Sequence, residues 1–144
     1  MKQKKTKQID VRKIYRIIDA NLNRSKEALR VCEDLYRFYW NDQHISKRIK
    51  TLRHKLTRIF LSLDVPYEDL LMSRDAAKDV GKRSFFLDKV TNISAKDIRT
   101  ANLKRSQESV RVLEEVAKTL SPKIAKQLQG LRFDLYELER KSFQ

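Results

Sequence analysis

One stretch of the sequence occurs twice, and this repeat limits the possible folds more than any other feature. Residues 20–37, "ANLNRSKEALRVCEDLYR", and residues 101–118, "ANLKRSQESVRVLEEVAK", are identical at nine of eighteen positions at an offset of 81. Ordinary composition predicts only about one or two identities in such a window. At an offset of 79, further matches pair Ile45 with Ile124, Lys47 with Lys126, Leu52 with Leu131, Arg53 with Arg132 and Leu56 with Leu135. The chain therefore consists of two related halves.

Both halves have the pattern of two amphipathic helices. Apolar residues recur about every 3.6 positions, and the stripe of the first helix includes Ile17 and Tyr39. Polar residues with N-cap chemistry precede each periodic segment, and Pro122 suits a first helical position. The expected N-caps are Asp10, Asp42, Ser94 (in a capping box with Asp97) and Ser121. The expected helices span about 10–40, 43–63, 94–120 and 122–141, with a short helical turn at "YEDLLM".

The segment 65–93 between the halves shows no clear period and contains Gly81. We expect a long ordered connection, in which "SFFL" at 84–87 could form a strand. Each helical hairpin alone would expose its apolar stripe, so packing the two together buries both. The sequence thus predicts an all-α four-helix bundle with internal pseudo-two-fold symmetry. Its parts are a basic tail 1–8 and one domain 9–144, made of hairpin one (9–64), the connection (65–93) and hairpin two (94–142).

The charge of the chain indicates an anionic partner. Its 33 Lys and Arg exceed its 19 Asp and Glu by 14, and removing the four tail lysines still leaves +10. A basic body favours nucleic acid, an acidic membrane surface or a phosphorylated metabolite, and charge alone does not choose among them. No apolar run approaches a membrane span, and "MKQKKTKQ" lacks the apolar core of a signal peptide. The single Cys32 cannot form an internal disulfide, so we expect an apolar filler in a cytoplasmic protein.

The repeated Asn and Arg are the main site candidates. On a helical wheel, Asn21 lies in the middle of the apolar face and Arg24 at its edge, and Asn102 and Arg105 repeat this arrangement. One interpretation is a buried polar cluster that fixes the register of the bundle, with Glu27, Glu33, Glu108 and Glu114 as partners. The other is a polar cavity for an anionic ligand, with the arginines as phosphate-binding forks. Physical reasoning supports both interpretations equally.

Other charged residues are weaker candidates. Arg53 and Arg132 interrupt the apolar stripes of the second and fourth helices, which favours a binding role over a surface one. Arg30 and Arg111 have glutamates three residues away, a spacing typical of surface ion pairs. The segment "MSRDAAKDVG" offers two carboxylates that could hold a hydrated Mg²⁺ beside cations that could meet phosphate. Its candidate residues are Arg74 for phosphate and Asp75 and Asp79 for metal and catalysis.

Four segments together resemble a known family. "YRIIDANLNRSKEALRVCED", "LRHKL", "RDAAKDVG" and "ANLKRSQESVRVLEE" resemble, in this order, the helical N-terminal domain that precedes the barrel of some bacterial thiamine-phosphate synthases. The likeness extends from about Tyr15 to Glu139. This family domain has been proposed to act as an alternative hydroxymethylpyrimidine-phosphate kinase. Because the sequence ends at Gln144, we expect the synthase barrel, and with it the synthase reaction, to be absent.

The resemblance implies a function in thiamine biosynthesis, with ATP and Mg²⁺ as expected cofactors. The leading hypothesis is an enzyme that phosphorylates a hydroxymethylpyrimidine phosphate, with the Asn/Arg cluster as its ligand site. The alternative is a non-catalytic helical partner of a separate thiamine-phosphate synthase. Nucleic-acid binding is the third hypothesis, and arginines that converge inward argue against it. We expect a monomer or homodimer that does not associate with membranes.

Overall fold

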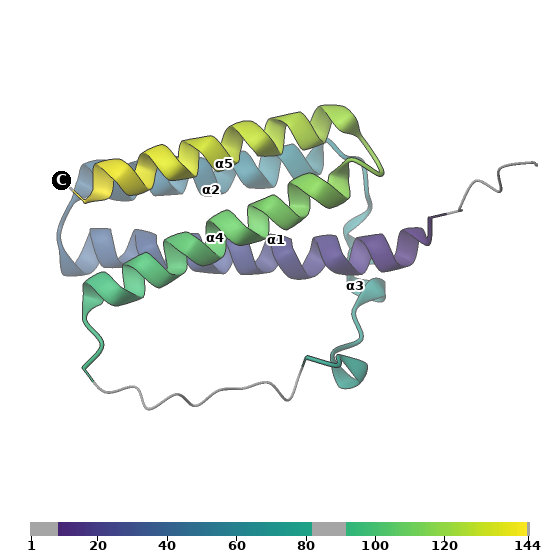
Figure 1. Cartoon of the computed structure of the whole chain (residues 1–144), viewed down its shortest axis with the longest axis horizontal. Helices are drawn as coiled ribbons and strands as arrows, with labels where there is room; N and C mark the ends of the chain where they lie inside the picture. The colour runs from purple at the N-terminus through teal and green to yellow at the C-terminus, as the bar shows by residue number, and fades with distance from the viewer. Residues whose placement is uncertain (1–8, 82–91, 144) are drawn as a thin grey trace, which may run out of the picture.

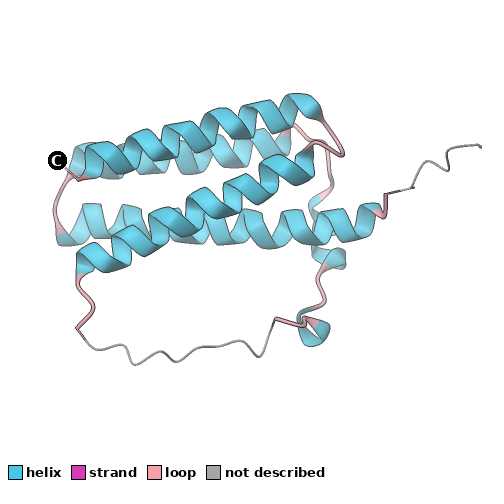
Figure 2. Cartoon of the chain, in the orientation of Figure 1, coloured by secondary structure: helices cyan, strands magenta, loops and turns pink. Residues whose placement is uncertain are grey.

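The computed structural model describes residues 9–81 and 92–143, in which four long helices form a bundle (Figures 1 and 2). The first half contains α1 (Val11–Asp34), the π-helical turn η1 (Leu35–Tyr39) and α2 (Gln43–Leu61). The connection contains α3 (Tyr67–Ser73) and the short 3-10 helix η2 (Ala76–Lys78). The second half contains α4 (Ala95–Ala117) and α5 (Pro122–Ser142). The all-α class is confirmed, whereas "SFFL" and the tail 1–8 lie outside the described residues.

The helices begin where the caps predict. The side chain of Asp10 accepts a hydrogen bond from the amide of Lys13, and that of Asp42 accepts one from Ile45. Ser94 forms the expected reciprocal capping box, Ser121 caps α5, and Pro122 occupies the first turn. These polar side chains satisfy amides that have no partner within the helix.

The bundle joins the two hairpins into one core. Helix α1 packs against α2 and α4, and α5 packs against α2 and α4, so that each hairpin contacts the other along two helices (Figure 1). Equivalent positions of the halves are equally buried: Leu29 and Val110 have no exposed surface, and the same holds for Leu56 and Leu135. The repeat thus serves to bury two related apolar faces against each other.

Four expectations about the helices were wrong in detail. The first helix does not stay α-helical to Trp40, because the Trp40 amide donates to the carbonyl of Leu35, five residues back. This π turn changes the phase of the stripe and leaves Tyr39 67% exposed. Ile17, also placed in the stripe, is 40% exposed. Helix α4 ends before Leu120, since Thr119 and Leu120 donate to carbonyls three residues back and tighten the last turn.

None of the helices in the described ranges combines the length and the apolarity needed to span a bilayer.

Candidate functional site

The two copies of the repeated helix, α1 and α4, contact each other at their serines. The hydroxyls of Ser25 and Ser106, which are equivalent residues, are hydrogen-bonded at 3.1 Å and fully buried. Small side chains at this point let the two helices approach closely. The pseudo-two-fold axis that relates the two halves therefore passes through the interface between α1 and α4.

A cavity of about 630 Å³, which we call the α1/α4 groove, opens beside this contact. All ten of its lining residues belong to pairs related by the offset of 81. The pairs are Asn21 with Asn102, Arg24 with Arg105, Glu27 with Glu108, Ala28 with Ser109, and Val31 with Val112. The repeat thus places both copies of the predicted Asn and Arg in one cavity.

The asparagines form the buried part of the groove. Asn21 and Asn102 are 6% and 7% exposed, and each amide nitrogen donates to the carbonyl four residues back, at Ile17 and Ile98 respectively, both at 2.9 Å. Each side chain is thereby held in one orientation. The two side-chain oxygens have no hydrogen bond with any described residue, so they can accept one from a ligand.

The arginines lie at the rim of the groove and not in its centre. Arg24 and Arg105 are exposed, which corrects the expectation that the two guanidinium groups are brought together inside the bundle. Neither guanidinium group forms a hydrogen bond or ion pair with a described residue, and the same is true of the carboxylates of Glu27 and Glu108. The rim therefore presents two cations and two carboxylates to a ligand.

Arg53 and Arg132 are bound to buried glutamates. Arg53 Nε lies 3.0 Å from Glu33, and Arg132 Nε lies 2.7 Å from Glu114, at repeat-related positions. The hydrogen bond to Glu114 raises the pKa of Arg132 above its usual value. Glu33 and Glu114, expected as partners of the Asn/Arg cluster, thus neutralise these two arginines instead. Phosphate binding by Arg53 or Arg132 stays a prediction.

Arg30 and Arg111 form the surface ion pairs that their spacing predicts. Arg30 lies 3.4 Å from Glu33, and Arg111 lies 3.9 Å from Glu114 and 3.0 Å from Glu115. Arg30 is thus a second cation beside Glu33, and Arg111 is a second cation beside Glu114; both arginines are exposed, whereas the two carboxylates are buried.

The predicted catalytic segment lines a separate cavity of about 160 Å³ against α1. Arg74 is bound there by both Asp19 oxygens, at 2.5 and 2.9 Å, which raises the pKa of the guanidinium. A guanidinium nitrogen of Arg16 donates to the carbonyl of Asp75 at 3.1 Å and fastens the segment to α1. No residue lines both this cavity and the α1/α4 groove, although Ala20 and Arg24, one from each, are one turn apart on α1.

The carboxylates of this cavity suit a weakly held metal ion. One oxygen of Asp75 accepts the amide of Lys78 and one oxygen of Asp79 accepts that of Gly81, which leaves one oxygen of each carboxylate for a ligand. Within residues 9–81 and 92–143, no three His, Cys, Asp or Glu side chains are grouped closely enough to hold a metal. Since Mg²⁺ often binds one or two carboxylates and completes its shell with water and phosphate, Asp75 and Asp79 fit such an ion. The cavity is too small for a nucleotide.

Two buried charged residues of the bundle are not among the candidates that the sequence predicts. Asp19, the partner of Arg74, is 55 residues away in the chain and carries no local signal. Arg99 is 6% exposed and packs its guanidinium over the rings of Phe143 and Trp40, at 4.2 and 5.5 Å. At the offset of 81, Arg99 is equivalent to the apolar Ile18. This mismatch between the two copies is the sequence feature that could have pointed to Arg99.

The chain is similar to known proteins over most of its length. The model of the ThiD2 family matches residues 16–141. The chain is 35% identical over 126 residues to a thiamine-phosphate synthase of Nostoc punctiforme, covering 88% of this chain and 34% of that protein. It is 34% identical over 134 residues to a thiamine-phosphate synthase of Rhodopirellula baltica, covering 90% of this chain and 35% of that protein.

The chain spans about a third of the length of these curated relatives. No solved structure matches it.

Proposed function

Because the chain belongs to the ThiD2 family, we propose that it acts in thiamine biosynthesis by binding a hydroxymethylpyrimidine phosphate in the α1/α4 groove. The observation that carries the proposal is the groove itself, in which the two repeated copies of one helix contribute five equivalent pairs of lining residues. Among the predicted arginines, Arg24 and Arg105 also differ from Arg53, Arg74 and Arg132, since the last three are bound by carboxylates.

The groove has complementary groups for both parts of such a ligand. A guanidinium can form two parallel hydrogen bonds with a phosphate, and Arg24 and Arg105 are free to do so. The side-chain oxygens of Asn21 and Asn102 can accept hydrogen bonds from an amino group carried by the pyrimidine ring. The volume of about 630 Å³ lies within the usual range for small-molecule sites.

The proposed reaction is phosphoryl transfer from ATP to the phosphate oxygen of the bound pyrimidine, which yields ADP and a diphosphate ester. Asp75 and Asp79 would hold Mg²⁺, which when bound would neutralise charge on the phosphate oxygens. Arg24 would orient the phosphate of the pyrimidine toward that segment, because it lies one helical turn from Ala20 in the neighbouring cavity. Phosphoryl transfer depends mainly on such positioning and charge neutralisation.

Calorimetry with hydroxymethylpyrimidine phosphate tests the binding site. Arg24→Met and Arg105→Met should each weaken binding about tenfold or more, the effect of losing a charge-assisted hydrogen bond. Both variants should unfold within about 0.5 kcal/mol of the original protein, because neither arginine has an internal partner. Arg30→Met is the matched control, since Arg30 is exposed on the same helix but does not line the groove. Unchanged affinity in both groove variants would place the ligand elsewhere.

A turnover assay tests the reaction. Protein incubated with hydroxymethylpyrimidine phosphate, ATP and Mg²⁺ should form the diphosphate product. Asp75→Asn and Asp79→Asn should lower turnover more than binding, whereas Asp69→Asn, on the exposed surface of α3, should not. Tight binding without any diphosphate product, across several metals, would reject the kinase and retain the binding function.

A second candidate function is that of a non-catalytic partner docked on a separate thiamine-phosphate synthase. Helix α5 favours it, because Phe133 and Tyr136 are 55% and 44% exposed and their rings lie 6.4 Å apart. Exposed neighbouring aromatics are enriched at protein interfaces. Co-purification with the synthase, lost in a Phe133→Ser variant, would support this role, and no co-purification would exclude it.

A further inference from the structure

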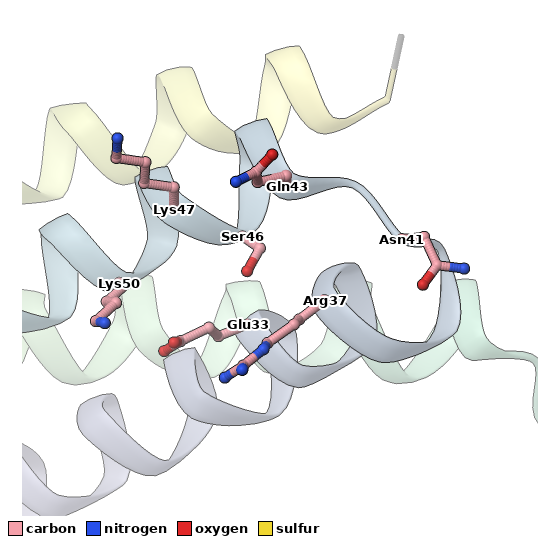
Figure 3. A pocket seen from close by; sticks show the side chains of 7 residues that line it. All are labelled: Glu33, Arg37, Asn41, Gln43, Ser46, Lys47 and Lys50. Atoms are coloured by element: carbon pink, nitrogen blue, oxygen red, sulfur yellow. The ribbon is translucent and has the colours of Figure 1, made fainter.

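A third cavity, of about 460 Å³, lies between the end of α1 and the start of α2, and the function proposed above does not use it (Figure 3). We call it the α1/α2 pocket. Its walls include Arg37 from η1, Glu33 from α1, and Ser46, Lys47 and Lys50 from α2. Since no residue lines both cavities, the pocket is separate from the α1/α4 groove.

The cations of the pocket have no anionic partner. Arg37 contacts the ring of Phe38 at 4.7 Å, but neither Arg37 nor Lys50 forms an ion pair with a described residue. The one carboxylate of the pocket, Glu33, is 3% exposed and already bound by Arg53 at 3.0 Å. The pocket therefore carries an excess of positive charge, to which the flexible Lys47 adds from the rim.

A buried hydroxyl also faces this pocket. Ser46 is 8% exposed, and its hydroxyl has no hydrogen bond with any described residue. It is not among the fully enclosed atoms, so the pocket gives access to it. Figure 3 shows the hydroxyl pointing from α2 toward the space above Glu33 and Arg37, with Lys50 to one side. Because this accessible hydroxyl has no partner among the described residues, it can donate a hydrogen bond to a ligand oxygen.

The second hairpin contains the equivalent pocket, where the hydroxyl is absent and fewer cations are unpaired. Its lining residues include Glu114, Lys118, Ala125, Lys126 and Gln129, which correspond to Glu33, Arg37, Ser46, Lys47 and Lys50 of the first. Alanine thus replaces the hydroxyl and glutamine replaces a lysine. Lys118 is bound to Glu115 at 2.9 Å, and the volume is only about 270 Å³. Equivalent positions line the two pockets, but only the first has a free hydroxyl, and its Arg37, Lys47 and Lys50 are all without an ion pair to a described residue, whereas in the second only Lys126 is unpaired.

We propose that the α1/α2 pocket binds the phosphate or diphosphate group of a small phosphorylated compound. Arg37 and Lys50 would bind the phosphate oxygens and Ser46 would donate its hydroxyl to one of them. A hydroxyl on a side chain that is only 8% exposed favours a small ligand over an acidic protein surface, which would reach only the exposed cations.

Calorimetric titration with inorganic diphosphate tests this site in a protein that carries Arg24→Met and Arg105→Met, so that the α1/α4 groove contributes no arginine. Lys50→Gln should weaken binding about tenfold and Ser46→Ala at least about threefold, because each installs the residue type of the other hairpin. Lys126→Gln, in the equivalent pocket, is the matched control and should leave the affinity unchanged.

Nuclear magnetic resonance gives the location independently. Diphosphate should shift the amide signals of Ser46 and Lys47 and leave those of Ala125 and Lys126 in place. Absence of diphosphate binding, or equal losses from Lys50→Gln and Lys126→Gln, would overturn the proposal. Because the groove arginines are absent from this protein, failure here leaves the proposed function untouched.

Discussion

Replacing Arg132 by methionine should destabilise the fold more than it weakens ligand binding. Arg132 donates to both oxygens of Glu114, at 2.7 and 3.4 Å, and the two side chains are 10% and 5% exposed. The variant would leave the Glu114 carboxylate buried without its main partner. Removing one member of a buried ion pair usually costs about 3–5 kcal/mol.

The structure places this case at the lower end of that range. Arg111 lies 3.9 Å from the same carboxylate and stays in place, so some neutralisation remains. We therefore expect Arg132→Met to lower the free energy of unfolding by about 3 kcal/mol. Arg53→Met should cost less, about 2 kcal/mol, because Arg53 makes one hydrogen bond to Glu33, at 3.0 Å, and is 16% exposed.

Urea unfolding followed by circular dichroism at pH 7 measures both values. Adding Glu114→Gln to Arg132→Met should recover a large part of the loss, because it removes the buried charge. Arg111→Met is the control for loss of an exposed arginine near Glu114 and should cost less than about 1 kcal/mol. A loss below about 1 kcal/mol in Arg132→Met, together with weaker ligand binding, would refute the structural role and favour the phosphate-binding one.

Two further predictions concern stability alone. Burial raises the pKa of Cys32 from 9.0 to about 12, so the folded state keeps a proton that the unfolded state loses above pH 9. The free energy of unfolding should therefore fall with rising pH between these values by about 1.4 kcal/mol per pH unit, a slope that Cys32→Ala should lack in parallel unfolding curves. Ser94→Ala should cost about 1 kcal/mol by removing the cap of α4, whereas Ser62→Ala, beyond the end of α2, should cost less in the same urea assay.

The helices could be predicted because their signals are local. A cap such as Asp42 and its partner amide at Ile45 are three residues apart, so the sequence shows both. The same holds for the ion pair of Arg30 with Glu33. The π turn after Asp34 has no comparable signal in the sequence. It shifts the helical periodicity by one residue, and this shift requires no particular residue type.

The partners of buried charges could not be predicted, because they are set by the packing of distant segments. Arg53 and Arg132 look like free cations in the sequence, and only the approach of α2 to α1 and of α5 to α4 brings them to Glu33 and Glu114. The helical wheel placed Asn21 correctly in the buried face. It could not show that the space beside Arg24 is open to solvent, since that depends on where α4 crosses α1.

The symmetry of the α1/α4 groove has a consequence for catalysis. An asymmetric ligand can enter a two-fold groove in two equivalent orientations, with its phosphate at Arg24 or at Arg105. The segment with Asp75 and Asp79 occurs once, however, and its cavity is lined by Arg16, Asp19 and Ala20 of α1.

On the proposed reaction, only the orientation with the phosphate at Arg24, one turn from Ala20, is productive. Arg24→Met and Arg105→Met should therefore weaken binding to similar extents, while Arg24→Met lowers turnover at saturating ligand several-fold more. Arg105→Met should leave that turnover unchanged or raise it, because it disfavours the unproductive orientation. Equal effects of the two variants on turnover would show that the segment 74–81 does not distinguish the two ends of the groove, and that the catalytic groups lie on its symmetry axis or elsewhere.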